Sequence, residues 1–153
     1  MSFICVRNVW QSYDGNVVLE RLNLEVNEGE FCTLVGASGC GKSTLLRCIA
    51  GLTEVDSGRI LIDGEDVVPL PPQKRGIAMV FQSYALFPHM SVAQNIAFPL
   101  KMAGVAKSEI DARVEQALKD VRLADKGGRM PTQLSGGQRQ RVAIARALVN
   151  RPR

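Results

Sequence analysis

The chain has 153 residues, of which 46% are hydrophobic, 22% charged and 5% aromatic, and its formal net charge is +4. These values are close to the average for a globular protein, and a domain of this length can bury an ordinary hydrophobic core. They exclude a mostly disordered chain. No run approaches the roughly 18 consecutive apolar residues that a membrane span requires, and residues 1–7 lack the pattern of a secretion signal, so we expect a cytosolic protein.

The cysteines and the single histidine predict neither a metal site nor a disulfide framework. Cys5, Cys32, Cys40 and Cys48 show no C-x-x-C spacing, and His89 is the only histidine, so a zinc site would lack ligands. A chain this rich in Leu, Val and Ile is expected to keep its thiols reduced. The positive charge is compatible with a nucleic-acid or membrane-surface partner, but scattered Lys and Arg side chains account for it more simply.

The first part of the chain has the pattern of strands and turns. Apolar and β-branched runs predict strands at residues 3–9, 17–26, 31–35, 59–62 and 77–81. A turn signal, Asp-Gly-Asn, separates the first two runs. Residues 31–35 are almost continuously apolar, which is typical of a strand buried on both faces of a parallel sheet. A helix is expected over residues 43–50, ended by Gly51.

From about residue 91 the pattern becomes helical. Ser91 and Ser135 are each followed three residues later by Gln, which predicts two capping boxes that open helices. Ser108 is expected to cap a third helix, whose apolar residues recur at helical spacing as far as Val121. The predicted organisation, in chain order, is a strand-rich part (about 1–90), a helical insertion (about 91–133) and a helix that returns to the first part (134–153).

Residues 36–43, Gly-Ala-Ser-Gly-Cys-Gly-Lys-Ser, match the phosphate-binding pattern G-x-x-x-x-G-K-[ST]. Glycines let several backbone N–H groups converge on one anion, and the following helix adds its positive dipole end. Lys42 supplies a positive charge for the β and γ phosphates, and the Ser43 hydroxyl suits Mg²⁺. A glycine-rich turn with an exposed lysine is the alternative. The residues expected at the phosphates are Gly36, Ala37, Ser38, Gly39, Cys40, Gly41, Lys42, Ser43 and Thr44.

A second candidate anion site opens the last helix, at Leu134-Ser135-Gly136-Gly137-Gln138. Two glycines after a Ser cap disfavour a helix by roughly 1 kcal/mol each relative to Ala, so we expect a compensating function. Bare glycines let a ligand approach the free N–H groups of a helix start; a flexible capped start is the alternative. The first loop already holds one set of phosphates, and one resolution is that the second site faces a nucleotide held by another copy, in a head-to-tail dimer.

The run LSGGQRQRVAIARAL, from Leu134 to Leu148, resembles the signature of the nucleotide-binding subunits of ABC transporters, and the resemblance covers the whole chain. It implies an α/β P-loop NTPase fold, namely an ABC-type nucleotide-binding domain with an N-terminal antiparallel β part and a helical subdomain. It also implies ATP and Mg²⁺ as cofactors. The resemblance implies a homodimer in which the ATP of the partner subunit is closed by Ser135, Gly136, Gly137 and Gln138.

Further roles follow from this resemblance. Tyr13 stands where the family stacks an aromatic ring on adenine, although a packed Tyr at a strand end is the alternative. Gln82 matches the glutamine that ligates Mg²⁺ together with Ser43. Residues 83–92 resemble the stretch of bacterial importers that docks on the permease, with a locally packed hydrophobic loop as the alternative. His89 has no metal partner and is assigned to that loop.

The stretch from Gln82 to Pro99 and the last residues resemble importers for polyamines, ferric iron, sugars or phosphonates, and polyamine is preferred. The resemblance implies an ATPase subunit at the cytoplasmic face of the inner membrane. Its implied partners are permease subunits and, indirectly, a solute-binding protein, with no nucleic acid. The family continues with a strand ending in Asp-Glu and a switch histidine, neither of which is matched here. We therefore expect a truncated fragment with an open sheet, slow hydrolysis and no catalytic residue of its own.

Two alternatives remain open. One is a binding module that holds ATP without hydrolysing it. The other is a non-transport ABC ATPase that acts on DNA or ribosomes. Only about 50 residues separate Gln82 from Ser135, too few for the long coiled-coil arms of the repair members, which disfavours the second alternative.

Overall fold

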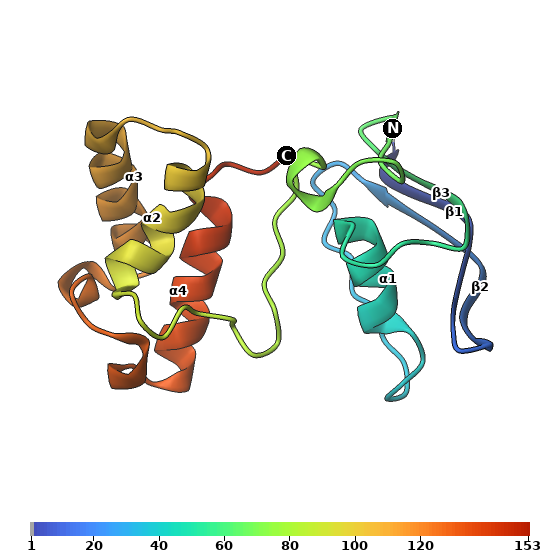
Figure 1. Cartoon of the computed structure of the whole chain (residues 1–153), viewed down its shortest axis with the longest axis horizontal. Helices are drawn as coiled ribbons and strands as arrows, with labels where there is room; N and C mark the ends of the chain where they lie inside the picture. Colours follow the sequence, from blue (N-terminus) through green and yellow to red (C-terminus); the bar gives the residue numbers. More distant parts are fainter. Residues whose placement is uncertain (1) are drawn as a thin grey trace. The chain divides into compact units, whose positions relative to one another are not determined.

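The computed structural model describes residues 2–153. These residues form two compact units, one ending at Ile77 and the other comprising Ala78–Arg153 (Figure 1). Each unit has a hydrophobic core of its own. The boundary lies after Ile77, whereas the sequence pattern predicts a strand-rich part that extends to about residue 90.

The first unit is built on a four-stranded sheet with the order β2-β1-β3-β4. The strands are β1 (Ser2–Tyr13), β2 (Asn16–Asn27), β3 (Ser57–Ile62) and β4 (Glu65–Asp66). Every neighbouring pair is antiparallel, which confirms the antiparallel β part implied by the family resemblance. β1 and β2 form a hairpin in which Tyr13 pairs with Asn16, so its turn falls within the predicted turn signal.

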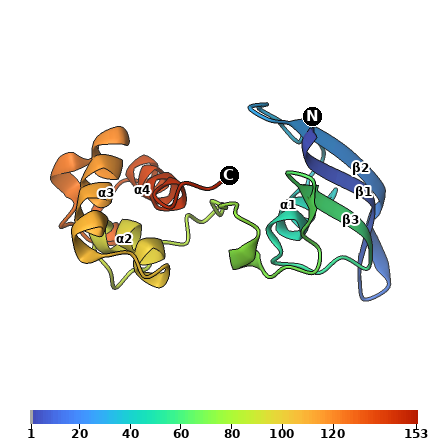
Figure 2. The ribbon, with the colours of Figure 1, turned by 90° about the horizontal axis from the view of Figure 1, so that it is seen from above.

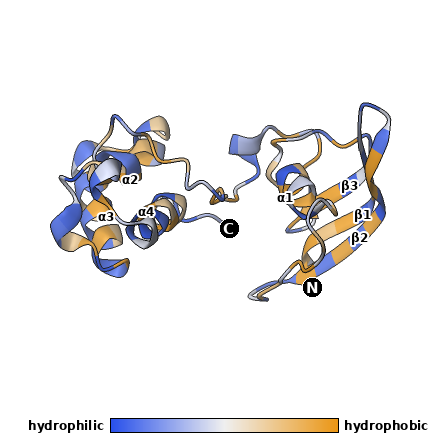
Figure 3. Cartoon of the chain, turned by 90° about the horizontal axis from the view of Figure 1, so that it is seen from below, coloured by the Kyte–Doolittle hydropathy of each residue, from blue (hydrophilic) through white to orange (hydrophobic). Residues whose placement is uncertain are grey.

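Helix α1 (Lys42–Ala50) packs on one face of this sheet (Figure 2). Its buried residues Leu45 and Ile49 share a core with Val9 and Ile60, which the strands contribute and which are fully buried. Figure 3 shows hydrophobic residues recurring along β1, β2 and β3. Burial of this apolar surface fixes α1, and the loop that leads into it, against the hairpin.

Arg75 fixes the C-terminal end of α1. The residue follows the short 3-10 helix η1 (Pro72–Lys74), and its side chain is buried. Nη1 donates to the carbonyl oxygens of Cys48 at 2.7 Å and Ile49 at 3.0 Å, and the other nitrogens donate to two carbonyl oxygens of the loop after β4. Burial lowers the pKa of Arg75. The carbonyl oxygens replace part of the solvation that this cation loses.

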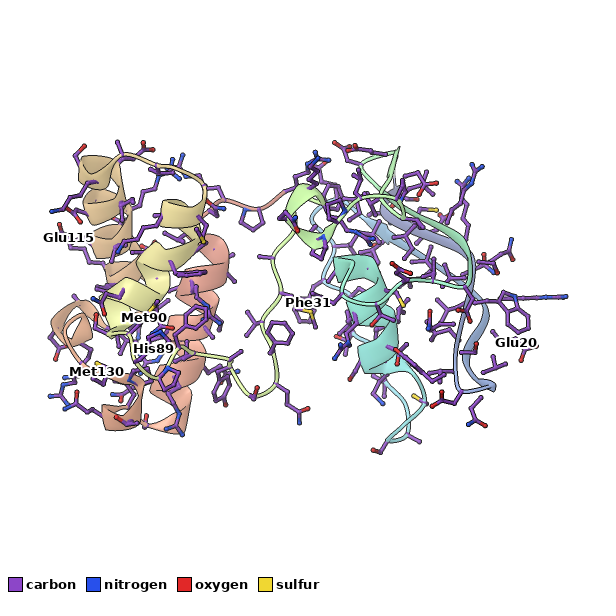
Figure 4. The ribbon with its side chains drawn as sticks, in the orientation of Figure 1. Glu20, Phe31, His89, Met90, Glu115 and Met130 are labelled. Carbon is purple, nitrogen blue, oxygen red and sulfur yellow. The ribbon has the colours of Figure 1, made fainter. Side chains whose placement is uncertain are left out.

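Two predicted strands do not form. Residues 31–35 and 77–81 have no regular structure and join no sheet among the described residues. Phe31 is 94% exposed and Val35 is 89% exposed, so the first segment is not buried on both faces as the sequence predicts (Figure 4). A parallel strand is stable only beside a hydrogen-bonded neighbour, and residues 2–153 supply none to either segment. No parallel sheet therefore forms around residues 31–35 or 77–81 among the described residues.

The second unit packs α2 (Val92–Met102), α3 (Lys107–Asp120) and α4 (Gly136–Leu148) together. The short 3-10 helices η2 (Ala124–Lys126) and η3 (Pro131–Gln133) lie between α3 and α4 in the chain. All three long helices contribute buried residues to one core. The segments predicted as a helical insertion and a separate last helix therefore share that core. Within residues 2–153, no helix combines the length and the apolar character that crossing a membrane requires.

Two of the three predicted helix caps are confirmed. Ser91 Oγ accepts from the N–H of Gln94 at 3.2 Å, and Gln94 Oε1 accepts from the N–H of Ser91 at 2.8 Å. Ser135 and Gln138 form the same reciprocal box at the start of α4. The prediction for Ser108 is wrong, because α3 begins at Lys107, two residues earlier than a Ser108 cap implies, and its cap position is Ala106, whose methyl group cannot accept a hydrogen bond.

Candidate functional site

The loop at residues 36–41 leads directly into α1 and forms the centre of the candidate site. Gly41 is the cap residue of α1, and no side chain caps this helix. The first N–H groups of the helix therefore have no partner within it. A hollow of about 240 Å³ is lined by Ser38, Gly39, Gly41, Lys42, Ser43 and Thr44. Unpaired N–H groups, the positive end of the helix dipole and a hollow together suit an oxyanion such as phosphate.

Gly41 has no room for a side chain, whereas a Cβ at Gly36 would displace only the side chain of Cys40. A Cβ at Gly41 would lie 2.9 Å from Cδ2 of Leu19 and 3.0 Å from the carbonyl oxygen of Val18, and the φ of +93° is itself unfavourable for an L side chain. A Cβ at Gly36 would lie 2.7 Å from Sγ of Cys40. The end of the loop thus lies directly against β2, which sets its position.

The ammonium group of Lys42 lies over its own loop. Nζ donates to the carbonyl oxygens of Gly36 at 2.8 Å and Ala37 at 2.7 Å, and to Sγ of Cys40 at 3.4 Å. The positive charge therefore stays beside the start of α1, where an anion would bind. Ser43 is exposed and lines the same hollow, so its hydroxyl is a suitable oxygen ligand for Mg²⁺ beside bound phosphates.

Tyr13 belongs to the same unit as the loop. It lies at the end of β1, where the hairpin turns, and is 45% exposed. The other strand of the hairpin contacts Gly41 through Val18 and Leu19, so hairpin and loop are held together. An exposed aromatic ring on this hairpin is available for stacking on a base.

The second predicted anion site lies in the other unit. Gly136 and Gly137 open α4, and a Cβ on either glycine would meet no atom within 4 Å. Ser135 Oγ accepts from the N–H of Gln138 at 3.3 Å, and Gln138 Oε1 accepts from the N–H of Ser135 at 2.9 Å. Packing within the described chain therefore does not require these glycines. The space beside them is open, and their role in binding a second nucleotide stays a prediction.

The candidate residues are divided between the two units. Tyr13 and residues 36–44 lie in the first unit, and Gln82 and residues 135–138 lie in the second. Gln82 is exposed, in a turn that precedes α2. The joint ligation of Mg²⁺ by Ser43 and Gln82 stays a prediction. Among residues 2–153, no group of three or more His, Cys, Asp or Glu side chains forms a metal site.

Two polar residues of the second unit could not be identified from the sequence. Asn95 is fully buried and pairs with the backbone of Phe87, 8 positions away. Arg146 donates to the carbonyl oxygen of Tyr84, 62 positions away. Both residues look like ordinary members of amphipathic helices, and no local pattern marks them, because their partners are set by tertiary packing.

Comparison with known proteins decides the family. The sequence pattern of ABC transporters matches residues 19–153, which include the phosphate-binding loop and the Ser-Gly-Gly start of α4. The chain belongs to the ABC transporter family. The family resemblance of the LSGGQ run is thereby confirmed, and so is the P-loop NTPase fold class that it implies for this ABC chain.

Several curated proteins of the ABC family are close in sequence. The chain is 71% identical over 148 residues to the spermidine/putrescine import ATP-binding protein PotA of Pseudomonas aeruginosa strain UCBPP-PA14, a match that covers 97% of the chain and 41% of that protein. Proteins of the same name from Nitrosospira multiformis and Haemophilus influenzae are 57% identical over 153 residues and 54% identical over 148 residues. These matches cover 100% and 97% of the chain and 42% and 40% of the two proteins. The chain thus spans about two fifths of the length of these relatives.

Proposed function

We propose that this ABC chain is the ATP-binding part of a subunit that energises a bacterial polyamine importer. The observation that carries the proposal is the loop at residues 36–44, which combines an uncapped helix start, the Lys42 charge and a lined hollow. Such a site suits the phosphate tail of a nucleoside triphosphate. Polyamine as the transported solute is supported by relatives that are spermidine/putrescine import ATP-binding proteins.

In this proposal the loop binds the β and γ phosphates of ATP, and Tyr13 stacks on the adenine ring. Binding requires Lys42 to exchange its bonds to the carbonyl oxygens of Gly36 and Ala37 for bonds to phosphate oxygens. Ser43 and Gln82 would hold Mg²⁺, which neutralises charge on the phosphates when bound. Hydrolysis of ATP by the full-length protein would then be coupled to transport.

A second nucleotide-binding subunit completes the proposed assembly. The open surface of Gly136 and Gly137 supports a head-to-tail dimer in which Ser135 to Gln138 close on the ATP of the partner subunit. Residues 83–92 meet the permease, which places the subunit at the cytoplasmic face of the inner membrane. A solute-binding protein acts through the permease, and no nucleic acid takes part.

Substitution of Lys42 tests the site. We expect Lys42→Ala to weaken the binding of Mg-ATP at least about tenfold, which corresponds to about 1.4 kcal/mol, because the loop loses its only ammonium group. Isothermal titration of the full-length subunit measures this change. The matched control is Lys107→Ala, since Lys107 is also the exposed first residue of a helix but lies outside the loop. Equal affinities of the two variants would remove Lys42 from the site.

Transport by the reconstituted protein tests the solute. The full-length subunit is assembled with its permease in proteoliposomes that contain Mg-ATP, and the solute-binding protein is added outside them. We expect ATP-dependent uptake of spermidine or putrescine, and none of a sugar, phosphonate or ferric iron. Uptake of one of these other solutes in place of polyamines would contradict the proposed solute while leaving ATP binding intact.

A further inference from the structure

Two helical side chains hold the backbone of the segment that precedes α2, here called the clamped segment (residues 84–91). The first is Asn95, which is fully buried. Its Oδ1 accepts from the N–H of Phe87 at 2.9 Å, and its Nδ2 donates to the carbonyl oxygens of Phe87 at 3.1 Å, Met90 at 3.0 Å and Ser91 at 3.1 Å. One amide group therefore contacts four backbone groups, with its two N–H hydrogens shared among three carbonyl oxygens, and restrains the segment.

The second side chain is Arg146 of α4. Its Nη1 donates to the carbonyl oxygen of Ala85 at 2.9 Å, and its Nη2 donates to that of Tyr84 at 3.0 Å. Nη1 also lies 3.4 Å from Oδ1 of Asn95, and the guanidinium carbon lies 5.3 Å from the centre of the Phe87 ring. Burial lowers the pKa of Arg146. The planar guanidinium group has two nitrogens that donate to two adjacent carbonyl oxygens, a geometry that an ammonium group cannot reproduce.

The backbone between these contacts is strained. Tyr84 has φ 65° and Ala85 has φ 46°, so two consecutive L residues adopt the left-handed conformation. This conformation is unfavourable for residues with a Cβ and persists only where the surroundings enforce it. The carbonyl oxygens of these same two residues accept from Arg146. Arg146 therefore stabilises a turn that the local sequence does not favour.

The clamped segment presents a mixed surface. Leu86 packs against the core of the helical unit, and the ring of Phe87 lies 4.7 Å from that of Phe98. Ala85 and His89 are exposed. Figure 4 shows His89 and Met90 beside the start of α2. The partly buried side chains of Leu86 and Phe87 anchor the segment, and the exposed side chains remain available for a partner.

One rigid helix connects this contact to the Ser-Gly-Gly turn. α4 begins at Gly136, and Arg146 lies ten residues further along the same helix, or about 15 Å at the usual rise. A displacement of residues 135–138 would therefore reach the clamped segment through α4 and the Arg146 guanidinium, without an intervening loop.

We propose that Arg146, supported by Asn95, is a positioning residue that shapes the clamped segment for docking on the permease and ties it to the Ser-Gly-Gly turn of α4. The proposal rests on the proposed function for the identity of the partner. Arg141 provides an internal comparison. It lies on the same helix and donates to the carbonyl oxygen of Val121 at 3.0 Å, at the end of α3 and outside the clamped segment.

Hydrogen exchange of the full-length subunit tests the clamp itself. We expect Arg146→Gln to speed amide exchange in the peptide that covers residues 83–91 about tenfold, because both carbonyl contacts are lost. The matched control, Arg141→Gln, should leave this peptide within about twofold of the wild type and speed exchange near Val121 instead. Equal protection of residues 83–91 in the two variants would overturn the proposal.

Binding to the solubilised permease tests the docking role. We expect Arg146→Gln to raise the Kd for the permease about tenfold while the Kd for Mg-ATP stays within about twofold, and Arg141→Gln to change neither. Adding Ala85→Gly should restore part of the permease affinity, because glycine adopts a positive φ without the clamp. Equal permease affinity of the two arginine variants would overturn the proposal.

Two further results separate the possible failures. If the wild-type subunit does not bind the permease, the proposed function fails and the docking role fails with it; if it binds but the two arginine variants agree, only the positioning role fails. If Arg146→Gln does not fold, Arg146→Lys is used instead, because lysine keeps the positive charge but lacks the paired donors of the guanidinium group. Wild-type exchange and affinity in Arg146→Lys would also overturn the proposal.

Discussion

Three cationic side chains donate hydrogen bonds to main-chain carbonyl oxygens, namely those of Lys42, Arg75 and Arg146. Bonds of this kind fix the path of the backbone rather than balance a neighbouring charge. Arg75 and Arg146 are held by several carbonyl oxygens in partly buried surroundings, which suits a permanent structural contact. Lys42 makes its contacts at an exposed loop, where phosphate oxygens can replace the carbonyl oxygens at little cost.

The thiol of Cys40 should report on nucleotide binding. Cys40 is exposed, and its Sγ lies 3.4 Å from Nζ of Lys42, so an adduct there would occupy the space of the phosphates. We expect a maleimide to label Cys40 and to block Mg-ATP binding, and bound Mg-ATP to slow the labelling at least about tenfold. Mass spectrometry of labelled peptides measures both effects.

The other cysteines supply the controls for this experiment. Cys32 is also exposed but lies outside the loop, so ATP should not change its labelling. Cys48 is buried, and burial raises the pKa of its thiol, so it should remain unlabelled in the folded protein. Labelling of Cys40 at the same rate with and without Mg-ATP would argue against its place at the phosphates.

At the scale of elements, α1 is held at both ends. Its start lies against β2, because Gly41 has no side chain to keep Val18 and Leu19 away. Its last carbonyl oxygens, including those of Cys48 and Ile49, accept from Arg75. A phosphate site at a helix start works only if the helix cannot shift, so we infer that both contacts serve the loop.

Removal of the Arg75 guanidinium should therefore destabilise the first unit. In Arg75→Leu, the carbonyl oxygens of Cys48 and Ile49 lose the guanidinium as a donor and that of Cys48 keeps only the N–H of Gly51, so we expect the free energy of unfolding to fall by about 3 kcal/mol. Arg47→Leu is the matched control, because Arg47 is exposed near the same helix end and, among residues 2–153, its side chain donates only to the Thr53 hydroxyl. Urea unfolding followed by circular dichroism measures both variants. A loss of less than about 1 kcal/mol in Arg75→Leu would contradict this role.

At the scale of the whole molecule, the candidate residues are carried by two units with separate cores. Two apolar segments, residues 31–35 and 77–81, belong to no helix or strand. Residues 31–35 combine β-favouring side chains with mostly exposed positions. Such a segment can complete a sheet once another strand pairs with it. The relatives are longer than this chain, so a longer protein has the residues to supply such a strand.

Labelling of Cys32 tests that idea. Cys32 is exposed in the 153-residue chain, and we expect it to react with a maleimide at least about tenfold more slowly in the full-length protein, where a paired strand would bury it. Cys5 and Cys48 are buried and should be unreactive in both proteins, which verifies that each is folded. If Cys32 reacts equally fast in both, no strand forms over residues 31–35.

Structural features that depend on residues close together in the chain could be predicted from the sequence. The capping boxes at Ser91 and Ser135, the first two strands with the turn between them, and the helix after the phosphate-binding pattern all form as predicted. The family was readable too, because its motifs are short and contiguous. Ser108 is the local exception, because the helix starts two residues earlier than a cap at Ser108 implies.

Features that depend on distant partners were decided by the tertiary structure. Residues 31–35 and 77–81 carry strand-like sequences, yet a strand needs a neighbour, and the described residues provide none. Arg75 and Arg146 look like solvated charges until packing brings backbone carbonyl oxygens to them from 26 and 62 positions away. Helix and strand propensity and short motifs depend on neighbouring residues. Strand pairing, side-chain burial and the bonds of arginines to distant carbonyl oxygens form only when segments far apart in the chain meet.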